Sequence, residues 1–367
     1  MNSEKRLFVD VNVIQTVPPS CLNRDDTNSP KTAIYGGVRR ARVSSQSWKR
    51  AMRLQFKEIF DESELGVRTK RIVELVASKI VEVDPEISPE DALKMSEKVL
   101  TTAGITVKTK EKKKKDQESE TIPEAQALFF MSTKQAENMA KIAIDGDYDK
   151  KKAKAILNSG NGIEISLFGR MVAESPDYNV DASSQVAHAI STHKVDNEYD
   201  FYTALDEKNT EDESGAGMMG TIEFNSSTLY RYATVAVHDL AKQIDDTVVL
   251  SKAVEGFVRA FIMSLPSGKQ NTFANRTVPY SVMIVVRQDQ PVSLVGAFES
   301  PVIPDKVSGG YNEASAKRMI EYEESTRDFV DAPVKTILVG KGLDVLGAAE
   351  DIRTAMSELR EYIEKEY

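Results

Sequence analysis

Few residues in this chain of 367 could carry out catalysis or hold a metal. It contains three histidines, His188, His193 and His238, and a single cysteine, Cys21. No histidine belongs to an HExxH motif and one cysteine cannot build a zinc site, so we expect the histidines to be structural. The sequence also lacks the phosphate-binding motif GxxxxGK[ST] and the nucleophile motif GxSxG. We therefore expect no cofactor and no metal.

The strongest catalytic candidate is the pair Asp25-Asp26, which lies beside a basic region of the chain. Adjacent aspartates can hold a divalent metal close to a phosphate, as a metal-dependent ribonuclease would require. Such a site normally needs a further oxygen donor, and none is recognisable nearby. In a loop, Asn23 and Asp25 are also common turn formers. We favour a protein without catalytic activity and keep the ribonuclease as an alternative.

The sequence offers a second kind of chemistry, the binding of a polyanion. The net charge of −9 argues against a nucleic-acid-binding protein. However, the segment from Thr27 to Lys57 contains no Asp or Glu, and the compensating acid lies elsewhere, notably between Asp206 and Glu213. An acidic protein with one basic stripe can still bind a polyanion there. The basic residues of the stripe are Lys31, Arg39, Arg40, Arg42, Lys49, Arg50, Arg53 and Lys57.

Two predicted elements would position this stripe. Residues 7–14 alternate between apolar and polar side chains, which predicts a half-buried strand, and residues 18–30 are expected to form a loop. Ser44-Ser45 then offers an N-cap for a helix in which apolar side chains recur at helical spacing. Lys49, Arg53 and Lys57 lie four apart on another face, with Arg50 beside them. The helix should thus bury one side and expose a basic ridge.

The rest of the chain predicts an α+β protein rather than a regular βα alternation. A helical insertion is expected over 61–158, interrupted by a charged, low-complexity segment at 108–120 that we expect to be a disordered loop. Strands are expected at 163–173, 186–195, 221–237, 280–287, 294–298 and 336–339. Helices are expected at 248–265, 313–330 and 348–364.

Size and composition bound the class of protein. A chain of 367 residues with 41% hydrophobic residues can form one large domain with insertions, or two domains. It contains no apolar run of about eighteen residues, and its charged N-terminus lacks a signal peptide, so we expect no membrane span. A single cysteine excludes an intrachain disulfide. We therefore expect a cytoplasmic protein.

Two unusual sequence motifs near the N-terminus resemble those of a known protein family. PSCLNRDD and AIYGGVRRARVSSQSWKRAMR, residues 19–26 and 33–53, closely resemble the N-terminal signature of the Cascade backbone subunit, the CasC family of type I-E CRISPR effectors. Further similar words extend the resemblance along the chain: LFGRM (167–171), AHAISTHKVD (187–196), GTIEFNSSTLYRYA (220–233) and GKQNTFA (268–274). The middle region, 61–158, resembles the family only in helicity and position.

The resemblance implies a hand-shaped α+β protein. Its palm would be a ferredoxin-like, RRM-type domain formed by residues 1–60, 159–195 and 225–367. Residues 61–158 would be helical fingers, and residues 196–224 a protruding thumb. Family members multimerise along a CRISPR guide RNA and present it in kinked segments for pairing with target DNA. The implied partners are guide RNA, further copies of the chain, other Cascade subunits and, through the guide, target DNA.

The resemblance also implies particular RNA contacts. A subunit that coats any guide should contact phosphates and leave sequence readout to base pairing. The residues that match the family positions are Arg24, Lys31, Ser44, Gln46, Lys49, Arg50, Met171, Lys269 and Gln270. The thumb wedge would be Met218 or Met219, in a polar, glycine-bearing loop; Met218 departs from the family pattern. Apolar side chains of this kind insert between bases in proteins that bend DNA.

Two further questions stay open in the sequence. Arg39, Arg40 and Arg42 could contact RNA or form ion pairs between subunits, for example between Arg40 and Asp206 or Glu207. Apart from the ribonuclease, the remaining alternative is a stand-alone RRM-type RNA-binding protein. Such a protein should show aromatic-rich strand words that stack bases, and Phe8 is the only aromatic residue in the first predicted strand.

Overall fold

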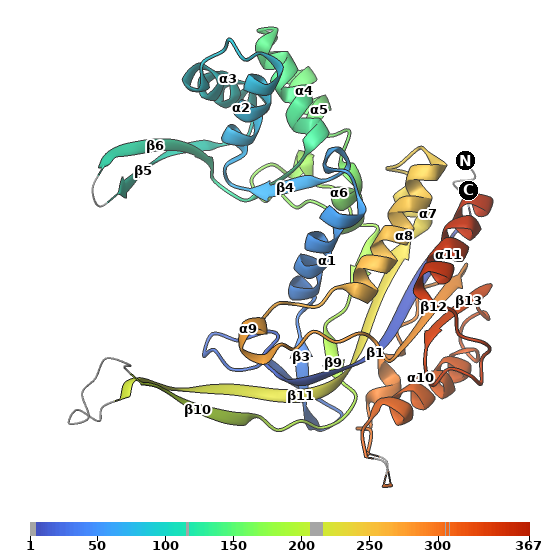
Figure 1. Cartoon of the computed structure of the whole chain (residues 1–367). Helices are drawn as coiled ribbons and strands as arrows, with labels where there is room; N and C mark the ends of the chain where they lie inside the picture. The colour runs from blue at the N-terminus through green and yellow to red at the C-terminus, as the bar shows by residue number, and fades with distance from the viewer. Residues whose placement is uncertain (1–4, 115–116, 206–215, 305, 308) are drawn as a thin grey trace. The chain divides into compact units, whose positions relative to one another are not determined.

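The computed structural model describes residues 5–114, 117–205, 216–304, 306–307 and 309–367 (Figure 1). The chain forms two compact units. We call Met1–Gln55, Gln185–His238 and Asp246–Tyr367 the sheet unit, and Phe56–Ser184 with Asp239–Asp245 the helical unit. The mixture of helices with an antiparallel sheet confirms the predicted α+β class.

A large antiparallel sheet forms the centre of the sheet unit, with the strand order β13-β12-β1-β11-β9-β3-β2. β8 and β10 pair with β11 outside this path. The strands are β1 (Phe8–Ser20), β2 (Thr32–Tyr35), β3 (Val38–Val43), β8 (Ser184–Val186), β9 (Ala189–Ser191), β10 (Glu198–Leu205), β11 (Ala216–Ala236), β12 (Ser281–Arg287) and β13 (Lys335–Gly340). The hairpin of β2 and β3 was not predicted, and β1 extends to Ser20, beyond the predicted start of a loop at residue 18.

Helices lie on both faces of this sheet. One face packs on α10 and on the 3-10 helix η3, through residues such as Met283 and Met319. On the other face, the guanidinium of Arg231 lies 3.9 Å from the ring of Trp48 in α1 and 4.7 Å from the ring of Phe261 in α8. The helices of or entering this unit are α1 (Ser45–Ile59), α7 (Val237–Ala241), α8 (Thr247–Met263), α9 (Gln270–Phe273), η3 (Leu294–Phe298), α10 (Asn312–Thr326) and α11 (Ile352–Glu366). The prediction of a strand at 294–298 is wrong, because this segment is η3.

The two covered faces explain why β1 differs from its predicted half-burial. Asp10 and Asn12 are as buried as Val9, Val11 and Val13, with which they alternate. Their polar atoms are satisfied inside the sheet: Tyr232 Oη donates to Asp10 Oδ1 at 2.9 Å, and Tyr230 Oη donates to Asn12 Oδ1 at 2.7 Å. Alternation of polar and apolar residues indicated a solvent-exposed face, but neighbouring tyrosines supply the bonds that let both faces be buried.

The helical unit has its own apolar core, formed mainly by α2, α3 and α4. Its elements are η1 (Glu62–Glu64), β4 (Gly66–Thr69), α2 (Ile72–Val83), α3 (Pro89–Thr102), β5 (Val107–Lys114), β6 (Gln117–Ala125), β7 (Phe129–Ser132), α4 (Thr133–Ile144), α5 (Lys150–Leu157), α6 (Gly162–Phe168) and η2 (Pro176–Tyr178). Two predictions are wrong here. The charged segment at 108–120 was expected to be a disordered loop, yet its described residues belong to the antiparallel strands β5 and β6. The strand expected at 163–173 is replaced by α6.

No helix in the described part of the chain is both long enough and apolar enough to cross a bilayer.

Candidate nucleic-acid interface

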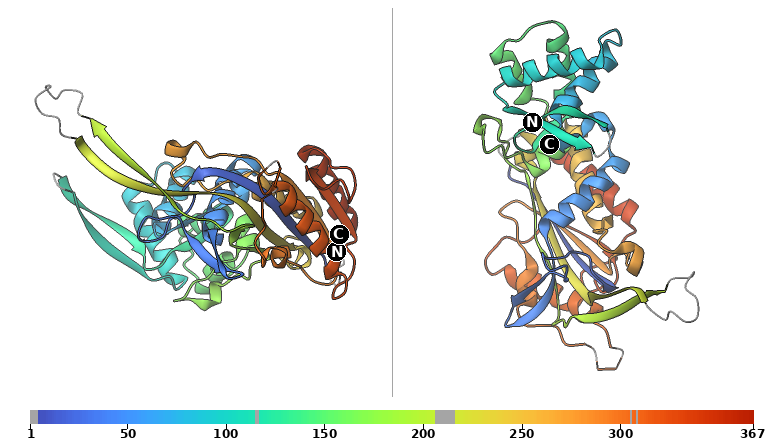
Figure 2. Two further views of the ribbon diagram at one scale, coloured as in Figure 1. Left: turned by 90° about the horizontal axis from the view of Figure 1, so that it is seen from below. Right: turned by 90° about the vertical axis from the view of Figure 1, so that its left-hand side faces the viewer.

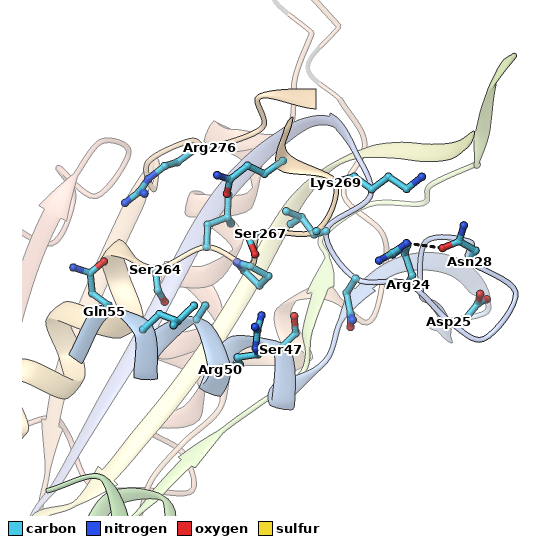
Figure 3. Close-up of a pocket in the computed structure, with 18 residues that line it drawn as sticks. Arg24, Asp25, Asn28, Ser47, Arg50, Gln55, Ser264, Ser267, Lys269 and Arg276 are labelled. Atoms are coloured by element: carbon cyan, nitrogen blue, oxygen red, sulfur yellow. Dashed lines mark hydrogen bonds between the residues drawn. The ribbon is translucent and has the colours of Figure 1, made fainter. Parts of the chain in front are cut away.

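A groove of about 770 Å³ lies in the sheet unit, between three segments that are distant in the sequence (Figure 3). Its walls are the segment that follows β1, one face of α1, and the segment that follows α8. Four of its lining residues are cations and one is an acid: Arg24, Arg50, Lys269, Arg276 and Asp25. The groove is therefore positive in a protein whose net charge is negative, which suits the binding of a polyanion.

Asn23 fixes the first wall to the start of α1. Its Oδ1 accepts a hydrogen bond from the Ser44 amide at 2.9 Å, and its carbonyl accepts one from the Lys31 amide at 2.8 Å. Ser44 is buried, and its hydroxyl accepts a long bond of 3.4 Å from the Ser47 amide, as an N-cap does. These bonds hold the loop that carries Arg24 against the helix that carries Arg50.

Gly268 brings the third wall against the first. A Cβ atom on Gly268 would lie 2.2 Å from the carbonyl oxygen of Leu22 and 2.6 Å from that of Cys21, so only glycine fits. The next residue, Lys269, has a left-handed backbone with φ of 48°. Burial raises the pKa of the Cys21 thiol, while the charges of Arg24 and Lys269 act in the opposite direction. Both cations are therefore close to the same point of the chain.

The face of α1 that lines the groove differs from the predicted ridge. The groove is lined by Ser47, Arg50 and Leu54, whereas Lys49 is not among its lining residues. Lys49 is half-buried, and this burial lowers the pKa of its ammonium group. Gln46 is exposed in the first turn. Of the residues carried over from the resemblance, the groove thus brings together Arg24, Arg50, Lys269 and Gln270.

Arg276 also lines the groove and was missed by the sequence analysis. It lies two positions after the GKQNTFA motif. The side-chain amide of the preceding residue, Asn275, donates to the Gly268 carbonyl at 3.4 Å. Figure 3 shows Arg276 among the residues that line the groove, and it lies on the segment after α8 that also carries Lys269. A basic residue two positions beyond a recognised word was the signal that could have indicated it.

The aspartate pair proposed for a ribonuclease lies at the edge of this groove. Asp25 Oδ1 accepts hydrogen bonds from the Thr27 hydroxyl and amide and from the Ser29 amide, at 2.8, 2.9 and 3.0 Å. The bond from the Thr27 hydroxyl is the main cause that lowers the pKa of this exposed carboxyl. Asp25 is thus a turn-forming residue. No cluster of three or more His, Cys, Asp or Glu residues suited to a metal occurs among residues 5–114, 117–205, 216–304 and the described remainder.

Arg40 has a structural position that its sequence context did not indicate. Its side chain is fully buried, and its guanidinium donates to the carbonyls of Tyr35, Ser191 and Phe298 at 3.2, 3.0 and 2.8 Å, and to Glu299 at 3.1 Å. A side chain bound in this way does not reach RNA or another subunit. The ion pair between subunits that the sequence suggested for Arg40 is therefore wrong. Its suggested partners, at positions 206 and 207, lie outside the described residues. The neighbouring Arg39 is exposed and Arg42 is half-buried.

The two candidate wedge methionines lie in a β-hairpin rather than in a loop. Met218 and Met219 belong to β11, where they pair with Ala204 and Thr203 of β10. Figures 1 and 2 show this hairpin extending beyond the rest of the sheet. Both side chains are largely solvent-exposed, at 57% and 65%. The prediction of a polar loop is therefore wrong at these two positions, although the prediction that apolar side chains are presented there is compatible with their exposure.

The strand register separates the hairpin's side chains into two faces. Residues opposite each other in an antiparallel pair share a face, so Met219 lies with Phe201 and Tyr199. Met218 lies on the other face with Tyr202, whose ring covers Gly220. Tyr199 and Phe201 are 67% and 65% exposed and were missed by the sequence analysis. Their alternation with Glu198 and Asp200 was the signal for a strand with an aromatic face.

Met171 belongs to the helical unit and is 82% exposed. The preceding residue, Arg170, is buried and donates to the carbonyls of Tyr178, Leu157 and Phe130. Gly169 has φ of 74° and approaches the Val180 carbonyl closely. The GRM word therefore anchors one residue inside the unit and presents the next to solvent. Met171 is therefore not a core residue.

Comparisons with known proteins agree with the resemblance found in the sequence. Residues 9–365 match the family described as CT1975-like protein. A chain of a structure titled "CRISPR RNA-guided surveillance complex, pre-nicking" is 32% identical, with a TM-score of 0.82 and coverage of 96% of this chain and 99% of that chain. A chain of a second structure, titled "CRISPR RNA-guided surveillance complex", is 29% identical, with a TM-score of 0.70 and the same coverage. No curated protein matches.

Proposed function

From the premise that this chain belongs to the CT1975-like protein family, we propose that it is a non-catalytic backbone subunit of a type I-E Cascade surveillance complex. In this role it multimerises along a CRISPR guide RNA in the cytoplasm and presents the guide in kinked segments for pairing with target DNA. The two similar chains come from structures titled as CRISPR RNA-guided surveillance complexes, which supports guide RNA and other Cascade subunits as partners.

The positive groove is the observation that carries this proposal. Arg24, Arg50, Lys269 and Arg276 line one groove although they come from three segments that are distant in the sequence. Arginine and lysine bind phosphates without reading bases, and the affinity they provide depends on salt. A groove of this kind suits a protein that must coat guides of any sequence. Lys31, Gln46, Lys49 and Gln270 are proposed as further contacts, and the buried Ser44 as a residue that positions the loop.

The exposed hairpin of β10 and β11 supports a second part of the proposal. An apolar side chain that is held on a strand and exposed to solvent can insert between bases without losing much conformational freedom. We propose that residues 196–224 are a thumb and that Met219, on the face with Phe201, is the wedge. Met171, which is also exposed, is proposed to contact a base of the guide.

The remaining architectural terms are part of the proposal. The sheet unit suits the ferredoxin-like, RRM-type palm, which would comprise residues 1–60, 159–195 and 225–367. Residues 61–158, which include α2 to α5, are proposed as the fingers. Repeated head-to-tail contacts between palms of successive copies would produce an open filament, provided that the rotation between copies does not close a ring.

Native mass spectrometry of the chain expressed with and without a CRISPR guide RNA tests this function. We expect RNA-dependent oligomers whose number of subunits grows with the length of the guide. A chain that remains monomeric in the presence of guide RNA would overturn the proposal. Shortening of the guide in the presence of magnesium would instead support the ribonuclease, and the loss of that cleavage in Asp26→Ala would confirm it.

A further inference from the structure

A second cluster of cationic and titratable side chains lies beside the groove, where β3 meets β9. Arg42 pairs with Ile190 and Val43 pairs with Ala189, which brings the end of β3 next to His188. Nη1 of the Arg42 guanidinium lies 3.3 Å from Nδ1 of the His188 ring. Lys31 joins the cluster because its carbonyl accepts a bond of 2.9 Å from the Arg42 amide.

The contact between Arg42 and His188 defines the state of the imidazole. A guanidinium has donors and no acceptor, so Nδ1 must accept and the proton must lie on Nε2. His188 is solvent-exposed, while Lys31 and Arg42 are half-buried. In its neutral form the imidazole therefore accepts a bond from Arg42 and carries its proton on Nε2.

This cluster is continuous with the groove. Leu22 and Asn23 line the groove on one side and a small hollow of about 20 Å³ on the other. The residues that line this hollow include Lys31 and Arg42 and no carboxylate. The hollow is too small for a nucleotide, so a ligand would lie across its rim. A chain of phosphates that crosses Asn23 would meet cations on both sides.

We propose that Lys31, Arg42 and His188 form a second phosphodiester subsite, in which His188 takes up a proton from solvent when the phosphate binds. This inference rests on the proposed RNA-binding function and adds two contacts and a dependence on pH to it. Protonation makes both ring nitrogens donors, so Nδ1 can no longer accept from Arg42. Arg42 Nη1 then donates to the phosphate instead, while Nε keeps its bond of 3.3 Å to the Thr32 carbonyl. Lys31, Arg42 and His188 thus each direct a donor at one anion.

The electrostatics of the free protein agree with this exchange. Burial lowers the pKa of His188, and the charges of Arg42 on β3 and of Lys31 before β2 lower it further. In the described part of the chain, these are the charged groups that shift the pKa of the imidazole. A phosphate between them would oppose their effect and raise the pKa again. Because binding raises the pKa, affinity must rise as pH falls toward and through the value in the complex.

The ratio of RNA affinities at pH 6 and pH 8 tests the inference in the full chain. The probe is a fluorescein-labelled oligouridylate at fixed ionic strength, with binding measured by fluorescence anisotropy. A rise of about one in the pKa of His188 on binding gives a limit of about tenfold tighter binding well below both pKa values, and because the pKa of the free imidazole is lowered we expect a ratio of about three- to sixfold between pH 6 and pH 8. His188→Asn keeps an acceptor for Arg42 and cannot be protonated, so we expect the ratio to fall to nearly 1.

Arg39→Ala is the matched control, because Arg39 is an exposed cation on the same strand and we give it no part in the subsite. It should retain the wild-type ratio. Burial raises the pKa of Asp10 to about 6, and His193 is a second buried group that can titrate. Both residues are present in every variant, so comparing the variants with wild type removes their contribution to the pH dependence. An equal ratio in wild type and His188→Asn overturns the inference but leaves the proposed function intact. Failure of the wild type to bind the probe at either pH overturns both.

A second measurement does not depend on the folding of a variant. The pKa of the His188 imidazole can be followed by NMR in the wild type, with and without the oligouridylate. We expect a rise when RNA is bound, and an unchanged value would overturn the inference.

Discussion

The groove and the β10–β11 hairpin expose opposite kinds of surface within the same sheet unit. The groove gathers cations from three segments and is held by main-chain contacts, such as the approach of Gly268 to Leu22. The hairpin presents Met219 and Phe201 from paired strands, and strand register alone determines which side chains share a face. The first surface suits phosphates and the second suits bases.

This difference separates two contributions to RNA binding. Contacts between cations and phosphates weaken as salt is raised, because binding releases counterions. Contacts between apolar side chains and bases depend little on salt and tolerate any sequence, because every base has a face for stacking. Variants in the two regions should therefore differ in their salt dependence as well as in affinity.

The largest effect is expected from removing two cations of the groove, in Arg50→Ala with Lys269→Ala. RNA affinity should fall on the order of a hundredfold at low salt, and the slope of log affinity against log salt should become shallower by about 1.4, or 0.7 for each lost phosphate contact. Anisotropy titrations over a range of salt concentrations measure both. Lys317→Ala with Lys365→Ala removes the same charge from α10 and α11 and should change neither quantity appreciably. An equal loss in that control would show that only net charge matters.

A smaller effect is expected when the groove is distorted but keeps its cations. In Gly268→Ala the new Cβ would overlap the Leu22 and Cys21 carbonyls, so the Lys269 segment must move away. We expect a destabilisation of about 1–3 kcal/mol, typical of overpacking, and about tenfold weaker RNA binding. Thermal unfolding and anisotropy measure the two effects. Ser267→Ala, at the exposed preceding residue, should leave both near wild type; if Gly268→Ala does the same, the close approach does not position Lys269.

Substitutions in the hairpin should weaken binding without changing its salt dependence. Met219→Ala removes an exposed side chain from the face shared with Phe201, and we expect about fivefold weaker binding with an unchanged salt slope. Met218→Ala changes the opposite face and should have less effect. The same titrations compare them, with stability checked by thermal unfolding. A larger loss in Met218→Ala would assign the wedge to the other face.

The smallest effect is expected for a glycine whose neighbour can move. A Cβ on Gly220 would lie 2.5 Å from Tyr202 Oη and 2.9 Å from its Cε1, a contact with a flexible side chain rather than with backbone. Tyr202 is 39% exposed and can turn into solvent, so Gly220→Ala should change the free energy of unfolding by less than about 0.5 kcal/mol. Chemical denaturation measures this change. A loss as large as that of Gly268→Ala would mean that the stacking of Tyr202 on Gly220 stabilises the hairpin.

The sequence predicted the features of this protein that depend on neighbouring residues. The absence of acid between Thr27 and Lys57, the N-cap at Ser44 and the apolar face of α1 are all local patterns, and the structure contains the helix they predicted. The long motif words indicated the family, which the comparisons confirm. Alternation also indicated the strand at β1, although not the burial of its polar face.

Only the tertiary structure decided which charged residues are available to a ligand. Arg40 and Arg50 lie in the same motif, yet Arg40 is buried among four carbonyls while Arg50 lines the groove. Met218 and Met219 were assigned to a loop because sequence patterns did not pair them with their partner strand, β10. Charge and helical periodicity are properties of a short segment. The burial of Arg40 against Phe298 and the close approach of Gly268 to Leu22 both join residues more than two hundred positions apart. No local pattern in the sequence specifies such contacts.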